Sequence, residues 1–212
     1  CKLQAGAMQW MAGDVSATTG IKGAGDFLSK TIRGKVTGES VIKPEYTGDG
    51  TLVLEPTYKH IILLDLDEWG NSIVLDDGLF LACESTLKQK AVRRKTFSSA
   101  FAGGEGFFNL GLKGSGVVCI DSDCPSAELV EITLEDDVVK IDGNLAIAWS
   151  GSLDFTVERA GKSLLGSAAS GEGLVNVYRG TGKVLLAPVG NQAMKPQQVI
   201  EKEPVIVGDD DE

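Results

Sequence analysis

From residue 38 onward, the sequence consists of short apolar or β-branched runs separated by turn-forming residues. Such runs, with Gly, Pro, Asp and Asn between them, are typical of β-strands and their turns. Residues 5–19 alternate between apolar and polar positions, which predicts a further half-buried strand. The runs lie at 51–55, 61–66, 72–75, 79–82, 117–120, 129–134, 138–141 and 145–149.

One helix is predicted, over residues 26–33. Asp26 suits an N-cap, the apolar side chains that follow it can share one face, and Gly34 is a suitable stop. The expected fold class is therefore mainly β with one short helix.

A Gly-x-Gly pair followed by an apolar strand occurs three times, and the pairs begin at residues 48, 114 and 180, a spacing of 66. A Gly-Glu pair precedes each one. A fixed spacing of this size indicates one structural unit used repeatedly. The candidate motif residues are Gly38, Glu39, Gly48, Gly50, Gly104, Glu105, Gly114, Gly116, Gly171, Glu172, Gly180 and Gly182.

The repeats predict one closed β domain over residues 1–195, with units at 38–100, 104–160 and 171–190. The third unit stops half-way, and residues 5–19 resemble its missing half, because Gly6 and Met8 take the places of Gly78 and Phe80 in the first unit. Closure of this kind would pair the sheet edges that a linear repeat leaves exposed. Residues 196–212 fall outside the pattern and predict an acidic C-terminal tail.

The charge balance disfavours nucleic acid as a partner. Twenty basic and thirty acidic side chains give a formal net charge of -10, which repels phosphate backbones. The four cysteines lack the spacing of a disulfide framework, which favours reduced thiols and a cytoplasmic protein. No apolar run approaches the length of a membrane-spanning helix, and peripheral membrane contact stays open.

The repeated motifs have two interpretations. Glu39, Glu105 and Glu172 could bind a cation or a partner's basic groups, but structural carboxylates that accept backbone hydrogen bonds in Gly-rich turns are favoured. The Gly-x-Gly pairs could bind phosphate, but each leads into a strand where a phosphate loop would open a helix. Tight turns are therefore expected at these positions.

No catalytic, metal or cofactor site is predicted. Cys119 and Cys124 flank two aspartates, but no second pair of soft ligands has suitable spacing for zinc. His60 is the sole histidine, so triad and Cys-His mechanisms would need His60 itself beside a nucleophile. The one basic cluster could contact an acidic partner, an anionic membrane or RNA, but a solvated strand face is favoured. It consists of Lys88, Lys90, Arg93, Arg94 and Lys95.

Several motifs together resemble the altered inheritance of mitochondria twenty-four family, also called the mitochondrial biogenesis family. They are Gly-Ala-Met-x-x-Met-x-Gly at residues 6–13, the Gly-Glu repeats, Leu81-Ala82, Ala148-Trp149-Ser150 and residues 170–175. The resemblance covers about residues 5–190. It implies three tandem β units similar to the fold of the tryptophan RNA-binding attenuation protein, and a bacterial source for most members. It carries no catalytic residues.

The leading functional hypothesis is a non-catalytic scaffold or interaction protein that forms homo-oligomers, since such units have edges and apolar faces to share. The alternative is a small-ligand or RNA binding module that uses clefts between the units. The expected location is cytoplasmic, or mitochondrial if the source is eukaryotic.

Overall fold

The computed structural model describes residues 1–19, 43–93, 95–96, 108–143, 145–159 and 174–188. Two 3-10 helices, η1 (Leu66–Trp69) and η2 (Ser126–Glu128), accompany the strands in this part of the chain. The helix expected at 26–33 lies outside the described residues. The strands are β1 (Lys2–Leu3), β2 (Met8–Thr18), β3 (Glu45–Leu54), β4 (His60–Asp65), β5 (Ser72–Leu75), β6 (Phe80–Cys83), β7 (Lys88–Arg93), β8 (Lys95–Thr96), β9 (Phe108–Lys113), β10 (Val117–Ser122), β11 (Val130–Asp142), β12 (Ala146–Ser150), β13 (Asp154–Arg159) and β14 (Leu174–Leu186).

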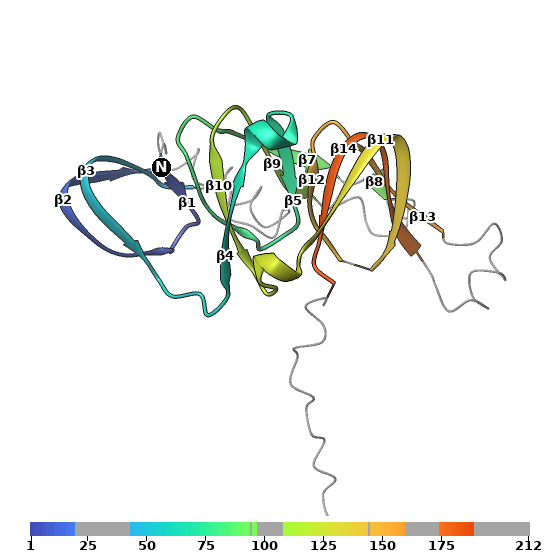
Figure 1. Ribbon diagram of the computed structural model, residues 1–212. Coiled ribbons are helices and arrows are strands. Elements are labelled where there is room, and N and C mark those ends of the chain that lie inside the picture. The colour runs from blue at the N-terminus through green and yellow to red at the C-terminus, as the bar shows by residue number, and fades with distance from the viewer. Residues whose placement is uncertain (20–42, 94, 97–107, 144, 160–173, 189–212) are drawn as a thin grey trace, which may run out of the picture.

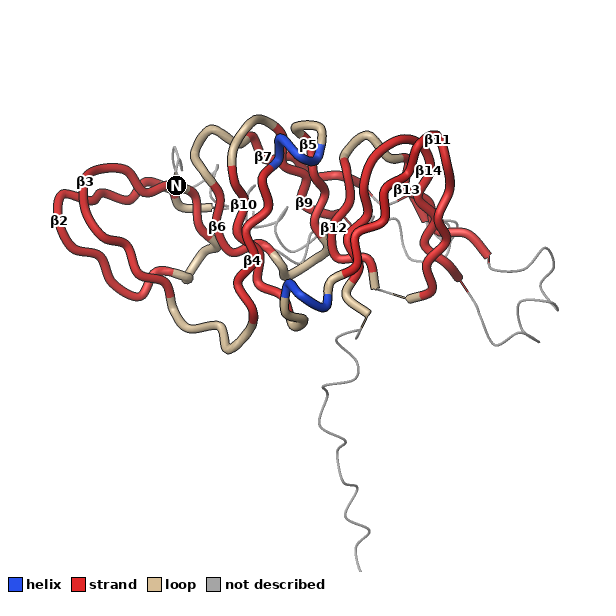
Figure 2. The backbone as a smooth tube through the Cα atoms, viewed as in Figure 1, coloured by secondary structure: helices blue, strands red, loops and turns tan. Residues whose placement is uncertain are grey.

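The prediction of a mainly β protein is confirmed, and strands dominate the described chain (Figure 2). They form two sheets. The first has the order β2-β3-β1-β6-β10-β4, and the second has the order β7-β9-β5-β12-β14-β13-β8, with β11 paired to β14. The described pairings are antiparallel except for that between β8 and β13.

The β5–β12 pair forms a wall between two hydrophobic cores. Successive side chains of a strand point to opposite faces, so both faces of this pair must be covered by apolar groups. Ile73 and Leu75 enter one core, while Val74 enters the other together with Trp149, which lies opposite it. All five residues of β12 are buried. This double burial explains why both strands read as nearly continuous apolar runs.

One bulged antiparallel pairing occurs three times: β2 with β3, β6 with β10, and β12 with β14. In each pair the first strand carries one extra residue, which has no partner on the opposite strand. The residues opposite the start of each bulge are spaced by 66 in sequence. The extra residues are Gln9, Leu81 and Ile147, and the pairs that precede them are Met8–Leu54, Phe80–Ile120 and Ala146–Leu186.

Two of the Gly-x-Gly pairs are bends inside the long strands β3 and β14, so the prediction of tight turns is wrong for them. The third lies in the short connection between β9 and β10, which belong to different sheets. Gly48, Gly114 and Gly180 have φ of +123°, +131° and +114°, where glycine is favoured. Strands turn corners between packed sheets at such points. At Gly180–Gly182, β14 changes partners from β13 to β12.

The predicted closure of residues 5–19 onto residues 171–190 is not found among the described pairings. β2 pairs with β3, whereas β14 pairs with β11, β12 and β13. Figure 1 shows β2 and β3 at one end of the molecule and β11, β13 and β14 at the other.

The acidic residues 135–137 separate the predicted strands at 129–134 and 138–141, which implied a turn there, and this expectation is also wrong. The two runs on either side of it form one strand, β11, with a register shift between Leu134 and Asp137. Asp136 has a positive φ of 53°, and its backbone N–H donates to the hydroxyl of Thr181. A polar run thus forms a bulge because β14 supplies a partner on both sides of it.

Candidate functional site: an exposed ribbon and a free edge

The β2–β3 pair forms a ribbon that is exposed on both faces. The strands pair from Met8–Leu54 to Thr18–Glu45, yet almost every residue of β2 is exposed. Trp10 and Met11 expose 49% and 43% of their surface. Apolar side chains of this size are normally buried, so their exposure makes the ribbon a candidate contact surface.

Glycines bring the two strands of the ribbon close together. A Cβ on Gly13 would lie 2.7 Å from the carbonyl oxygen of Asp49, and a Cβ on Gly48 would overlap the carbonyl of Asp14. No ordinary side chain fits at such approaches, and Gly48 also has a positive φ. The motif glycines of this unit therefore shape the ribbon, and they offer no side chain for binding.

The base of the ribbon is fixed to the first sheet. The Cys1 ammonium donates to the carbonyl of Tyr46 at 2.8 Å, and the Tyr46 N–H donates to the carbonyl of Cys1 at 2.8 Å. Lys2 and Leu3 pair with β6 on the other side of β1. The ribbon is thus held through β1, while the outer edge of β2 has no strand partner in the described part of the chain.

A second free edge lies at the opposite end of the molecule. β11 pairs with β14 along one edge, and no other described strand pairs with it. Val138 exposes 45% of its surface there, and Lys140 is exposed beside it. An unpaired strand edge presents backbone N–H and C=O groups to any strand of suitable sequence.

The other two tryptophans are core residues. Trp149 packs against Phe155 and Tyr178, with ring centroids 5.0–5.3 Å apart within the trio. Trp69 is 3% exposed, and the ammonium of Lys183 lies 5.8 Å from its ring centroid. Only Trp10 among the three tryptophans is available for a contact outside the chain.

An ion pair holds β13 against β14 beside the third glycine bend. Arg179 donates to both oxygens of Glu158, at 2.7 and 2.9 Å, and Thr156 donates to Glu158 Oε1 at 2.8 Å. These hydrogen bonds, that of Arg179 foremost, lower the pKa of Glu158 to about 2. The pair also raises the pKa of Arg179. The ion pair between Arg179 and Glu158 is therefore a structural link between β13 and β14.

The cysteines form neither a disulfide nor a metal cluster. All four are free thiols, and no group of three His, Cys, Asp or Glu side chains within the described ranges is placed to hold a metal. Burial raises the pKa of the Cys83, Cys119 and Cys124 thiols, so they are held as neutral thiols. The hydroxyl of Ser122 accepts from the Cys124 N–H at 3.1 Å, which orders the turn.

A further apolar strip lies on β4. Ile61 and Leu63 expose 52% and 68% of their surface and lie opposite Asp121 and Cys119 of β10. Asp121 Oδ1 is enclosed and has no hydrogen-bond partner in the structure. His60 begins this strand and is exposed, so the sole histidine lies at a surface strand end.

The basic cluster is described in part. Lys88 and Lys90 are exposed on β7, and Lys88 lies opposite the exposed Lys113 of β9. Arg94 lies outside the described residues, as do Gly38, Glu39, Gly104, Glu105, Gly171 and Glu172. The role expected for the three glutamates stays a prediction. Lys113 was missed, because only the pairing of β7 with β9 brings it to the cluster.

Comparison with known proteins relates most of the chain to one family. The family model described as mitochondrial biogenesis AIM24 matches residues 1–189. An uncharacterized protein of Streptococcus pyogenes serotype M6 is 31% identical over 191 residues, which cover 87% of this chain and 75% of that protein. The crystal structure of a Streptococcus pyogenes protein is similar with a TM-score of 0.65 and 28% identity, over 91% of this chain and 84% of the other.

The described residues contain no helix that is both long and apolar enough to cross a membrane.

Proposed function

The chain belongs to the mitochondrial biogenesis AIM24 family, and from this premise we propose that it is a non-catalytic scaffold or interaction protein that associates with itself. One observation carries the proposal: β2 and β11, at opposite ends of the molecule, each have an edge without a strand partner among the described residues, and β2 presents Trp10 and Met11 to solvent. Free edges and exposed aromatic groups are the features by which β proteins recruit further strands.

The chemistry of the described residues supports a non-catalytic role. The thiols of Cys83, Cys119 and Cys124 are held neutral. Ser122 lies opposite the sole histidine, but its hydroxyl donates to the carbonyl of Cys124 at 2.8 Å. A nucleophile activated by an ordered base would be expected at a catalytic centre. The pKa of Glu158 is lowered to about 2 by hydrogen bonds from Arg179, and this contact ties two strands together.

Native mass spectrometry of the gently purified protein tests this proposal. We expect a discrete homo-oligomer without a stoichiometric small-molecule adduct. A bare monomer at micromolar concentration would contradict self-association. A retained nucleic acid or small molecule would favour the second candidate function.

The second candidate is an anion-binding module for a small ligand or RNA, in keeping with the alternative drawn from the sequence. The pairing of Lys88 with Lys113 favours it, because like charges directly opposite one another destabilise a sheet unless a counter-charge joins them. Lys90 lies two residues along on β7. Retention of RNA that falls steeply with salt, and that is lost on Lys88→Glu, would support this candidate.

We also propose an intracellular location, within mitochondria where the source is eukaryotic. The four free thiols support a reducing compartment. Fractionation of the source cells, with detection by antibody, tests it, and recovery from the extracellular medium would contradict it.

A further inference from the structure

Two of the three bulged strands have a second neighbour on their other edge. β12 pairs with β5, with Leu75 opposite Ala148 and Val74 opposite Trp149. β6 pairs with β1 at the corresponding positions, with Leu3 opposite Ala82 and Lys2 opposite Cys83. Ala148 and Ala82 both follow the extra residue of their bulge, so the two pairings share one register.

The third bulged strand, β2, has no second neighbour in the described part of the chain. Trp10 and Met11 occupy the places that Ala82 and Cys83 take in β6 and that Ala148 and Trp149 take in β12. Those four residues are at least half-buried, whereas Trp10 and Met11 are exposed. A neighbouring strand is therefore expected beside the exposed Trp10 and Met11.

The strand that fits this place is the second half of β11. It pairs with β14 in the register that β5 has with β9, displaced by 66 residues at every position. It is therefore equivalent to β5, but the edge that β5 uses to pair with β12 is free in β11. The matching pairs are Ser72–Lys113 with Val138–Arg179, Ile73–Leu112 with Val139–Tyr178, Val74–Gly111 with Lys140–Val177, and Leu75–Leu110 with Ile141–Asn176.

We propose that β2 of one copy adds to the free edge of β11 in a second copy, as an antiparallel strand. The register of the two existing pairings fixes the contacts: Trp10 opposite Ile141, Met11 opposite Lys140, and Ala12 opposite Val139. This inference rests on the proposed self-association and names the surface and the partner that produce it.

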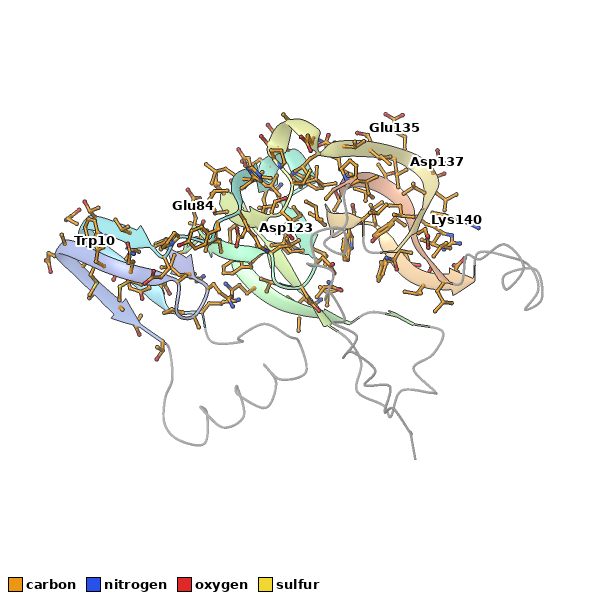
Figure 3. All side chains as sticks on the ribbon, turned by 90° about the horizontal axis from the view of Figure 1, so that it is seen from below. Trp10, Glu84, Asp123, Glu135, Asp137 and Lys140 are labelled. Carbon is orange, nitrogen blue, oxygen red and sulfur yellow. The ribbon has the colours of Figure 1, made fainter. Side chains whose placement is uncertain are left out.

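The partner is a second copy because the two edges lie at opposite ends of one molecule. Figure 3 shows Trp10 and Lys140 at opposite ends of the molecule. β1 fixes the ribbon to the first sheet at one end. The β5–β12 wall, buried on both faces, fixes the other end.

The chemistry of β1 shows what Lys140 contributes. Lys2 takes the same place in β1, and its ammonium donates to the carbonyls of Ser85 and Leu87 at 2.7 and 2.8 Å. The corresponding carbonyls in the ribbon of a second copy belong to Gly13 and Val15. Lys140 therefore places its charge on backbone acceptors, while its carbon chain covers Met11.

Each copy carries one β2 edge and one β11 edge, so the contact is head-to-tail. Two copies can satisfy both edges of each other, and a longer series closes only if the rotation between copies returns to its start. The assembly is therefore expected to be a closed ring of few copies, with β2 covered in every member.

Disulfide trapping tests the register directly. Met11→Cys and Lys140→Cys are made as separate variants, each with the exposed Cys1 replaced by serine. Residues opposite one another in antiparallel strands have Cα atoms about 4.5–5.5 Å apart, which a disulfide can bridge. On mixing and mild oxidation we expect a disulfide-linked heterodimer as the main product. Glu135→Cys, exposed on β11 but outside the register, serves as the control and should not link to Met11→Cys.

Each other outcome is decisive. A linked monomer from the Met11→Cys/Lys140→Cys double variant, with no link between mixed single variants, would show pairing within one chain and overturn the proposal. No link in either sample, with oligomers still seen by native mass spectrometry, would overturn this surface and leave the proposed self-association intact. Monomers throughout would overturn both.

Discussion

Arg179 holds both oxygens of Glu158 in a two-point contact that joins β13 to β14. The bond lies one residue before Gly180, where β14 bends and changes partners. The contact therefore fixes the strand on one side of the bend, and its strength should depend on the charge of Glu158.

Glu158→Gln should lower stability at neutral pH and have little effect in acid. The folded-state pKa of Glu158 is about 2, below its ordinary value of 4.5, so its contribution is fully present above the ordinary value and is lost as pH falls through about 2. The gap in urea midpoint between the parent and Glu158→Gln should be constant above pH 5 and should narrow below it. Glu135→Gln is the control, and an equal gap at pH 7 and pH 3 would refute the assignment.

Gly48→Ala should open the ribbon. The new methyl would overlap the carbonyl of Asp14, and the positive φ adds strain of about 1–3 kcal/mol. Gly78→Ala is the matched control, since Gly78 has φ of +78° with open space around its Cβ position. Hydrogen exchange should rise over β2 and β3 in the Gly48 variant and stay unchanged there in the Gly78 variant. Protection equal to the parent in both would contradict the close approach.

Replacement of Trp149 by alanine should lower the unfolding free energy much more than replacement of Trp10. Trp149→Ala leaves a cavity beside Phe155 and Tyr178 and should cost about 3–5 kcal/mol of unfolding free energy. Trp10→Ala should cost about 0.5 kcal/mol or less at concentrations where the protein is monomeric. Urea titration of both variants measures this difference. A large loss for Trp10→Ala in dilute solution would assign Trp10 to the fold of the single molecule.

A charge swap should break and restore the assembly. Met11→Lys would place a cation opposite Lys140 of the next copy, at a cost of about 1 kcal/mol per contact, or roughly fivefold in dissociation constant. Met11→Lys with Lys140→Met exchanges the two groups and should recover most of the loss. Analytical ultracentrifugation reads the dissociation constants. Additive losses in the double variant would argue against direct contact.

Lys88→Glu should stabilise the second sheet, since it turns a like-charged pair with Lys113 into an opposite one, by about 0.2–1 kcal/mol. Lys90→Glu is the control, because Gly111 lies opposite Lys90 and offers no charge. Thermal denaturation at low salt measures both. If phosphate raises the stability of the parent and fails to do so for Lys88→Glu, the anion-binding candidate gains support.

The local sequence pattern was sufficient to predict where strands lie, but it was insufficient to predict which strands pair with one another. The run at 72–75 was predicted with the bounds that β5 has, because an apolar β-branched run between turn residues has few alternatives. Residues 135–137 carry the same acidic signal as a turn, yet they form a bulge in β11, since β14 lies alongside. Whether such an acidic run forms a turn or a bulge depends here on Thr181 and its strand, 45 residues further along the chain.

The candidate surface could be predicted only in part. The motif glycines were identified from their spacing, but the sequence suggested turns, because a strand that bends between sheets and a hairpin both favour glycine. Trp10 lies in the strand predicted at 5–19, but the sequence pattern did not specify that its side chain would be exposed. Lys113 joins Lys88 only through strand pairing, which short-range pattern does not specify.

The position of β14 in the sequence has a consequence for synthesis. This strand pairs with β11, β12 and β13, all of which leave the ribosome before it. While translation passes residue 174, β11 lacks its described strand partner and β12 and β13 each lack one of their two, so a nascent chain in that interval is a substrate for chaperones and for aggregation. One late segment therefore completes the second sheet, and a stop codon before residue 186 should leave the earlier strands of that sheet more exposed to proteases.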